Sequence, residues 1–496
     1  MSSFSSLNVG SLAIHAAQRG LDVTGQNISN SATLGYTRQR VDQVAVGGPT
    51  VPAIWSRYDA VGGGVRVTGI SRVRDEFLEA RARVAHGNLA ETQKLEQTYA
   101  AIERTIDEPS STGLQSRLAE FWNAAGKMSN DPTAQAPRNL TFERAVAVAN
   151  HLNGMANQLT TQWSDTVTEA RANVNDVNVM AKDLAKLNRA IRNNTISGLP
   201  SNELADQRDL LVEKIATLTG ATAERIADGQ VSVRLGNAYL VSGVENSAIK
   251  LVATGSDPRT STLSVQWAQA TDPEAAAATA EFFNPGTAAV AHSSTSGGGV
   301  GELSGQLKTV NEILPGYLKS LDTVATQFVA TVNGQQASYT DPNTGVTSQP
   351  YTVDGTPGAA LFSGTNASNI AVIAGKAPND LAISKGNPAA APPATPVLDG
   401  DNALAMSRHL SDPSGADATY RAMVVELGVE AQSVARTGQA RTVVAKDADD
   451  ARENVSGVSL NEEMTNLVKY QHSFSAAAKF ITTVDTTIEA LLNMVR

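Results

Sequence analysis

Apolar residues recur with a seven-residue period over the last stretch of the chain, residues 459–496. A second apolar set lies three positions after the first, whereas the far face carries polar residues such as Thr482 and Glu489. The predicted seam comprises Leu467, Tyr470, Phe474, Ala477, Ile481, Val484, Ile488, Leu491 and Val495. This 3.5-residue repeat is typical of a helix that supercoils against another helix.

The opposite end of the chain offers a partner for that helix. Small residues, Gly10, Ala17 and Thr24, follow its apolar positions by three and would allow two helices to pack closely. The apolar positions of this second seam are Leu7, Ile14, Leu21 and Ile28. We predict a terminal coiled-coil domain formed by residues 1–40 with 456–496. The alternative is that both stripes are core faces of one globular domain.

The interior is helical in two blocks. Helical periodicity runs from 71 to 220 and includes one run of roughly 50 residues, 140–191, which is far longer than an ordinary globular helix. Helix returns over 302–333, where Pro315 predicts a kink or a break, and again from Tyr420 onward. These blocks predict an elongated helical bundle domain made of residues 41–228, 300–334 and 400–455.

Two insertions interrupt the helical pattern. Apolar and polar residues alternate within 229–299, as they do in half-buried strands, so this stretch predicts a β-rich insertion. Residues 335–399 predict a second irregular or β-rich insertion that ends in a stiff Pro/Ala linker. The expected fold class is therefore mainly α with β-rich insertions, in a multidomain α+β chain.

Composition narrows the classes of partner and chemistry. The 496 residues carry a formal net charge of −10, which argues against nucleic acid as a partner. The sequence has no cysteine, so it excludes disulfides and thiolate metal sites. No apolar run is long enough for membrane insertion, and the first 20 residues do not resemble a cleavable signal peptide.

Catalytic patterns were sought and none is convincing. The sequence Asp341-Pro-Asn-Thr-Gly345 begins like a calcium loop but lacks the later glycine and glutamate, so it predicts a turn. Asp206, Arg208 and Asp209 predict a solvated or inter-helix ion network. Tyr36 and Arg38 are assigned to packing after the first helix. We expect no enzyme activity, no cofactor and no metal.

Two stretches at opposite ends of the chain resemble a known family. Residues 23–38 and 456–471 are similar to the N- and C-terminal signatures of bacterial flagellar rod, hook and hook-associated proteins. Within that group, the interior stretches 187–191 and 202–209, and residues 130–132 with Arg138, resemble the hook-associated proteins at the hook–filament junction. The signature residues are Asn27, Asn30, Gly35, Tyr36, Glu462, Glu463, Tyr470 and Gln471.

The resemblance implies a structural protein that joins hook to filament in a ring or tube. It implies self-association through the terminal helices, the hook protein and a second junction protein as neighbours, and an export chaperone at the C-terminal helix. It also implies an extracellular location, reached by type III export without a cleavable signal. The alternatives are a flagellar hook or rod protein, a second junction protein or flagellin, and an exported enzyme with flagellar export ends.

Overall fold

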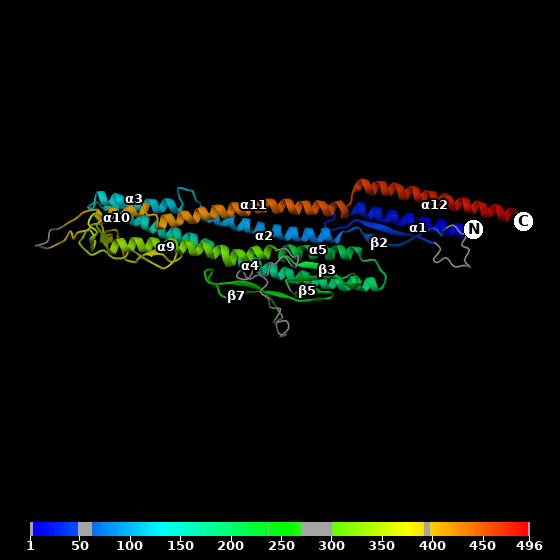
Figure 1. Ribbon diagram of the computed structural model, residues 1–496, viewed down its shortest axis with the longest axis horizontal. Coiled ribbons are helices and arrows are strands. Elements are labelled where there is room, and N and C mark those ends of the chain that lie inside the picture. The colour runs from blue at the N-terminus through cyan, green and yellow to red at the C-terminus, as the bar shows by residue number, and fades with distance from the viewer. Residues whose placement is uncertain (1–2, 48–61, 237, 269–299, 391–396, 495–496) are drawn as a thin grey trace.

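One helix, α4 (Gln135–Ile196), organises the fold because it contacts most other parts of the bundle. It has 62 residues and is therefore roughly 93 Å long at ~1.5 Å per residue. The computed structural model describes residues 3–47, 62–236, 238–268, 300–390 and 397–494, which form an elongated rod with both termini at one end (Figure 1). The sequence predicts this helix over 140–191, five residues short at each end.

The remaining bundle helices pack on α4 or on its neighbours, as α10 and α11 do, and share one hydrophobic core. Asp75 caps the first of them, since its carboxylate accepts the Phe77 and Leu78 N–H groups. Gly220 ends another in the left-handed conformation, at φ 72°. These helices are α2 (Glu76–Ile106), α3 (Leu114–Asn130), α5 (Asn202–Thr219), α8 (Glu302–Lys308), α9 (Leu314–Ala337), α10 (Asp401–Arg408) and α11 (Ala416–Ser456).

The predicted break at Pro315 is a π-helical turn. The turn η3 (Thr309–Ile313) joins α8 to α9, and the proline lies in the first turn of α9. Proline has no N–H to donate and its ring clashes with the preceding turn, so a wider turn there accommodates it. The apolar face still runs continuously through the break, because Leu307, Val310 and Leu314 are all buried.

Small antiparallel sheets lie on the flank of α4. Asn188 of α4 donates to the carbonyl oxygens of Val231 at 2.7 Å and Gly243 at 2.6 Å, so it fixes the sheet to the helix. The inner side chains Val233 and Leu240 are fully buried in the bundle core. The strands are β3 (Thr222–Arg225), β4 (Val231–Leu235), β5 (Ala238–Ser242) and β6 (Glu245–Asn246) in one sheet, and β7 (Ile249–Ala253) with β8 (Leu263–Trp267) in another.

The second insertion is mostly irregular, as the sequence predicts. Its strands are two residues long, β9 (Tyr339–Thr340) with β10 (Thr347–Ser348) and β11 (Phe362–Ser363) with β12 (Ala371–Val372). Asp341 accepts the N–H of Asn343 at 2.8 Å, which makes the calcium-like sequence a turn, as predicted. Short 3₁₀ turns η4 (Pro378–Asp380) and η5 (His409–Ser411) complete this end, and η1 (Ala227–Gly229) precedes β4. The alanine-rich 275–280, the stretch 293–299 and linker residues 391–396 lie outside the described residues.

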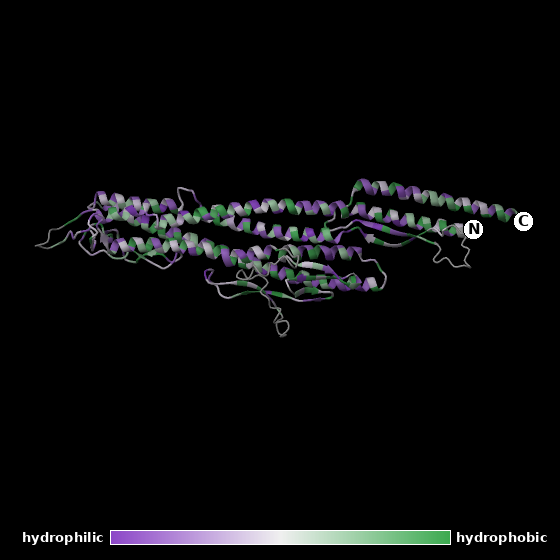
Figure 2. Cartoon of the chain, in the orientation of Figure 1, coloured by the Kyte–Doolittle hydropathy of each residue, from purple (hydrophilic) through white to green (hydrophobic). Residues whose placement is uncertain are grey.

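The terminal helices pair antiparallel beyond the end of the bundle. Helix α1 (Ser3–Ser29) lies along α12 (Leu460–Met494), and hydrophobic residues recur along both (Figures 1 and 2). The contact is close because α1 presents glycine: a Cβ on Gly20 would lie 2.4 Å from the Tyr470 ring, and one on Gly10 2.5 Å from Ile481 Cγ1. Large side chains of α12 therefore fill spaces left by small residues of α1.

Substitution of these glycines should separate packing from helix propensity. Gly20→Ala should weaken the α1–α12 pairing, because overpacking costs about 1–3 kcal/mol and outweighs the gain in helix propensity of about 1 kcal/mol. Gly25→Ala is the matched control, because its Cβ would meet nothing within 4 Å. This variant should slow amide exchange, since alanine has the higher helix propensity. Amide exchange across α1 and α12 measures both. Faster exchange in both variants, or in neither, would contradict the packing.

A buried carboxylate in the bundle predicts a pH effect. Asp417 accepts the Trp122 indole N–H at 2.8 Å, and burial raises the pKa of its carboxyl above the ordinary value. A raised pKa means that the protonated form stabilises the fold at low pH and that this stability is lost as the pH rises through the folded pKa. The free energy of unfolding of Asp417→Asn, minus that of wild type, should therefore be larger at pH 7 than at pH 4.5. Urea unfolding at both values tests this, and a difference independent of pH would refute it.

Candidate functional site: the joint between the terminal coil and the bundle

Side chains from both ends of the chain meet where the terminal coil joins the bundle. Asn27 of α1 donates to Glu463 Oε2 of α12 at 3.2 Å and to the Gln39 carbonyl at 2.9 Å. Its own side-chain oxygen accepts from the Tyr36 hydroxyl at 2.9 Å and the Gln39 N–H at 3.0 Å. Four signature positions of the sequence analysis, Asn27, Tyr36, Glu462 and Glu463, thus lie at one place, which we call the joint.

Arg38 connects the joint to the start of α12. Its guanidinium contacts Glu463 Oε1 and Glu462 Oε2, both at 2.8 Å, and the backbone N–H of Arg38 donates to the Ser456 carbonyl at 3.1 Å. The two carboxylates differ in burial, because the side chain of Glu463 is 2% exposed and that of Glu462 is 61% exposed. Glu463 is therefore the member whose charge requires a partner.

The β1–β2 hairpin carries the joint onto the bundle. Strand β1 (Gln39–Ala45) pairs antiparallel with β2 (Val65–Arg72). The Val73 N–H donates to the Arg38 carbonyl at 2.8 Å, and the Thr37 N–H donates to Asp206 Oδ2 at 3.3 Å. The segment after α1 is therefore bonded both to the hairpin and to α5.

A buried ion cluster holds the hairpin against α5. Arg72 contacts Asp206 Oδ1 and Asp209 Oδ2 at 2.8 Å each, and Arg74 also pairs with Asp209. Burial, followed by the charge of Arg72, lowers the pKa of Arg208 to about 9. The sequence predicts a solvated or inter-helix network here. The structure shows a cluster that is buried and that connects a strand to a helix, so the solvated alternative is wrong.

Tyr36 lies partly buried at the joint. Burial, with a smaller effect of the Asp206 charge, raises the pKa of its phenol to about 12. The phenol is therefore protonated at physiological pH and donates a hydrogen bond to the side-chain oxygen of Asn27. The sequence assigns Tyr36 and Arg38 to packing, but the structure shows that both make specific polar contacts.

The other signature residues have local roles. Asn30 donates to the Gln26 carbonyl at 3.0 Å and ends α1. Gly35 has φ 80°, a left-handed conformation that favours glycine. Tyr470 packs against Gly20, as described above, whereas Gln471 is exposed.

Most of the predicted seam residues are half-buried, and Ala477 is buried. On α1 the buried positions include the small residues Gly10, Ala17 and Gly20, together with Val23 and Thr24, whereas the bulky seam positions are only half-buried. Val495 lies outside the described residues, and Leu491 is 51% exposed. The half-buried seam residues are Leu7, Ile14, Leu21, Ile28, Leu467, Tyr470, Phe474, Ile481, Val484 and Ile488.

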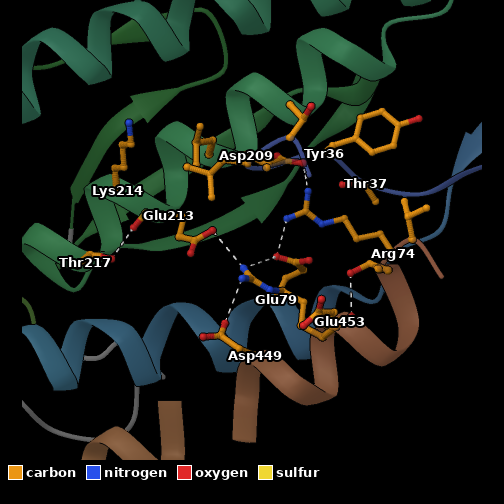
Figure 3. Close-up of a pocket in the computed structure, with 18 of the residues that line it drawn as sticks. Tyr36, Thr37, Arg74, Glu79, Asp209, Glu213, Lys214, Thr217, Asp449 and Glu453 are labelled. Carbon is orange, nitrogen blue, oxygen red and sulfur yellow. Dashed lines mark hydrogen bonds and ion pairs between the residues drawn. The ribbon is translucent and has the colours of Figure 1, made fainter. Parts of the chain in front are cut away.

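A hollow of about 1070 Å³ lies beside the joint, between the turn at 31–37, α4, α5 and the end of α11 (Figure 3). We call it the joint groove. Arg452 of α11 lies within it, against Glu213 at 3.1 Å and Asp449 at 3.0 Å. The groove is lined by both charged and apolar side chains.

Comparison with known proteins decides the family. The model of the flagellar hook-associated protein FlgK helical domain matches residues 99–362, which is more than half of the chain. The chain belongs to the FlgK family. The C-terminal model of the flagellar basal body rod FlgEFG proteins matches residues 452–494. That second match covers α12 and the joint residues Glu462 and Glu463.

Individual relatives agree with this assignment. Flagellar hook-associated protein 1 of Bacillus subtilis is 28% identical over 99% of this chain and 98% of its own length. The Escherichia coli protein of the same name is 25% identical over 52% of this chain and 46% of its own length. The solved flagellar hook junction protein FlgK of Burkholderia pseudomallei has the same fold, with a TM-score of 0.59, 15% identity, and coverage of 76% of this chain and all of that one.

These comparisons confirm several predictions from the sequence. The FlgK-family chain resembles hook-associated protein 1, and its fold class, mainly α with β-rich insertions, is as predicted. It is a structural protein of the bacterial flagellum and not an enzyme.

In the part of the chain that the structure describes, no helix is long and apolar enough to span a bilayer, and acidic and histidine side chains form no metal-binding group.

Sequence reasoning missed two residues of the joint, Arg72 and Arg74. They lie at the end of β2 and just after it, with side chains less than 10% exposed. Arginines spaced by two on a strand edge, within reach of an acidic helix, were the available signal. Their partners, Asp206 and Asp209, are more than 130 residues away, so the pairing depends on the tertiary fold.

The joint predicts different effects for two neighbouring arginines. Arg38→Met should leave the buried Glu463 carboxylate without its cation and cost about 3 kcal/mol or more locally. Arg40→Met is the matched control, because its pair with Asp42 is exposed and is worth less than about 1 kcal/mol. Amide exchange at 457–470 should accelerate by roughly 100-fold in the first variant only. Equal exchange in the two variants would show that the Arg38 pair does not hold the joint.

Proposed function

We propose that this chain is a subunit of the hook–filament junction that assembles through its terminal coil. The observation that carries the proposal is the joint, where both signature stretches converge and orient the coil relative to the bundle. Support comes from the family match over 99–362 and from the hook-associated relatives. The sequence left open the alternative that the chain is a flagellar hook or rod protein. The family match over 99–362 favours the hook-associated class.

The coil supplies a surface for neighbouring copies. Along α12, several apolar side chains remain exposed although α1 is paired with the helix, including Val468 at 46% and Leu492 at 66%. A narrow two-helix coil buries little of its own surface, so identical neighbours can cover the rest, and head-to-tail contacts between them produce a ring or an open helix. The family resemblance implies that the terminal helices form the inner part of this tube.

The finer partners follow from the family resemblance and are also part of the proposal. The hook protein and a second junction protein would be the neighbours on either side. An export chaperone would cover the exposed apolar positions of α12 before assembly, in the manner of an amphipathic helix in a groove. Export would proceed without a cleavable signal, and the residue groups predicted as domains would act as coil, bundle and outward insertions.

Substitutions on two faces of α12 test the assembly role. Ile481→Asp places a carboxylate against Gly10 in the coil contact, where burial of an unpaired charge costs several kcal/mol. Thr482→Asp places the same charge on the exposed face and is the control. In a flagellated strain carrying only the variant gene, Ile481→Asp should abolish filaments while the purified chain keeps its helical circular dichroism. Normal filament growth with Ile481→Asp would overturn the assembly proposal.

A further inference from the structure

The joint groove is acidic and partly apolar. Arg74, Lys214 and Arg452 supply three positive charges in its lining, against six carboxylates. Arg452 lies within 4 Å of three of those carboxylates, so its single charge is shared among them. Two apolar side chains border the same groove and are largely exposed, Leu34 at 80% and Val179 at 59%. The six carboxylates belong to Glu79, Asp176, Asp209, Glu213, Asp449 and Glu453.

The turn that follows α4 has the opposite character, and we call it the α4 tip (residues 196–199). The Gly198 N–H donates to the Thr195 carbonyl and the Leu199 N–H to the Asn194 carbonyl, with Gly198 at φ 69°. This bonding is a Schellman motif, which fixes the turn. Two apolar side chains are exposed on it, Ile196 at 71% and Leu199 at 58%.

Basic residues precede the α4 tip. The last three turns of α4 carry Lys186, Arg189 and Arg192 and no acidic residue, and the first charged residue after the tip is Glu203, so residues 186–203 have a formal net charge of +2. Lys186 and Arg189 are exposed and Arg192 is half-buried. In the groove, Asp209 pairs with Arg72 and Arg208, and Glu79 pairs with Arg74. The remaining lining charges are those of Asp176, Glu213, Asp449 and Glu453 against Lys214 and Arg452, a formal net charge of −2.

We propose that the α4 tip of one copy of this chain docks into the joint groove of the next copy. Charge complementarity and the exposed apolar side chains on both surfaces favour this pairing. The inference rests on the proposed function, since it names the surface by which bundles of neighbouring subunits meet. Both surfaces lie on the flank of the rod, so a neighbouring copy that lies alongside, shifted along the long axis by the distance between tip and groove, brings its tip to the groove.

The contact has to be between copies. Val179 in the groove and Ile196 at the tip belong to the same helix, α4. Seventeen residues separate them, which is roughly 25 Å along a continuous helix at ~1.5 Å per residue. A tip cannot reach the groove of its own chain, and a tip-to-groove contact joins different surfaces. Such a contact is heterologous and repeats from copy to copy.

Disulfide trapping in assembled flagella tests the contact, because the chain has no cysteine of its own. The variant Val179→Cys/Ile196→Cys, expressed as the only copy of the gene, should form a ladder of dimers, trimers and larger species on oxidation of isolated hook–junction preparations. Each single-cysteine variant is a control and should remain monomeric. A disulfide requires Cα atoms within about 7 Å, so the ladder reports direct contact.

The outcomes separate this inference from the proposed function. Variant chains that are present in the isolated junctions but form no ladder would overturn the docking contact and leave the junction role intact. Wild-type chains missing from the junctions would overturn the proposed function itself. Dimers from either single variant would show a symmetric contact between like surfaces, and a disulfide to a different protein would show another occupant. Both results would contradict the docking.

Charge reversal supplies a second measurement. In the two-cysteine background, Lys186→Glu with Arg189→Glu should reduce the multimers at least several-fold, because the tip then repels the groove. Adding Asp176→Lys and Glu453→Lys in the groove should restore them. Restoration requires that the two surfaces meet, whereas a merely structural effect of the tip residues would persist. Multimers unchanged by the first reversal, or not restored by the second, would refute the charge pairing.

Discussion

The arrangement of this chain depends on one buried carboxylate, Glu463. It lies in the first turn of α12 and is almost inaccessible to water, so its charge must be satisfied by the protein. Arg38 and Asn27, both from the N-terminal 40 residues, satisfy it. Because those partners are also bonded to the hairpin and through it to α5, a single charge connects the two ends of the sequence and the bundle. The orientation of the terminal coil follows from that network.

The rest of the architecture separates rigidity from assembly. The bundle buries a continuous apolar core along α4, and the sheets are fixed to that helix by Asn178 and Asn188. The coil, in contrast, packs glycine against large side chains and leaves apolar positions of α12 uncovered. A rigid bundle with a partly exposed coil suits a subunit of a flagellar assembly, because neighbouring subunits can cover the apolar side chains of α12 that the single chain leaves exposed.

Local periodicity was enough to predict much of this fold. The long α4 and the break at Pro315 follow from patterns within one helix. Strand β3 was missed because its four residues lie before 229–299, the stretch predicted to be β-rich. The small residues Gly10, Ala17 and Thr24, expected from the sequence to allow close helix packing, are buried, and Gly20, which the pattern did not single out, lies against Tyr470. The Glu463 network joins residues more than 400 positions apart and depends on the antiparallel register of two helices.

The most direct test of the joint is the distance between the coil and the bundle in solution. Spin labels on Val443→Cys of α11 and Ser475→Cys of α12 occupy exposed positions on either side of it, in a chain with no other thiol. Double electron–electron resonance should give one narrow distance distribution for this pair. The same pair with Glu463→Gln should give a broad one. A broad distribution in the otherwise unaltered chain, or a narrow one in both, would contradict the claim that the Glu463 network sets the orientation of the coil.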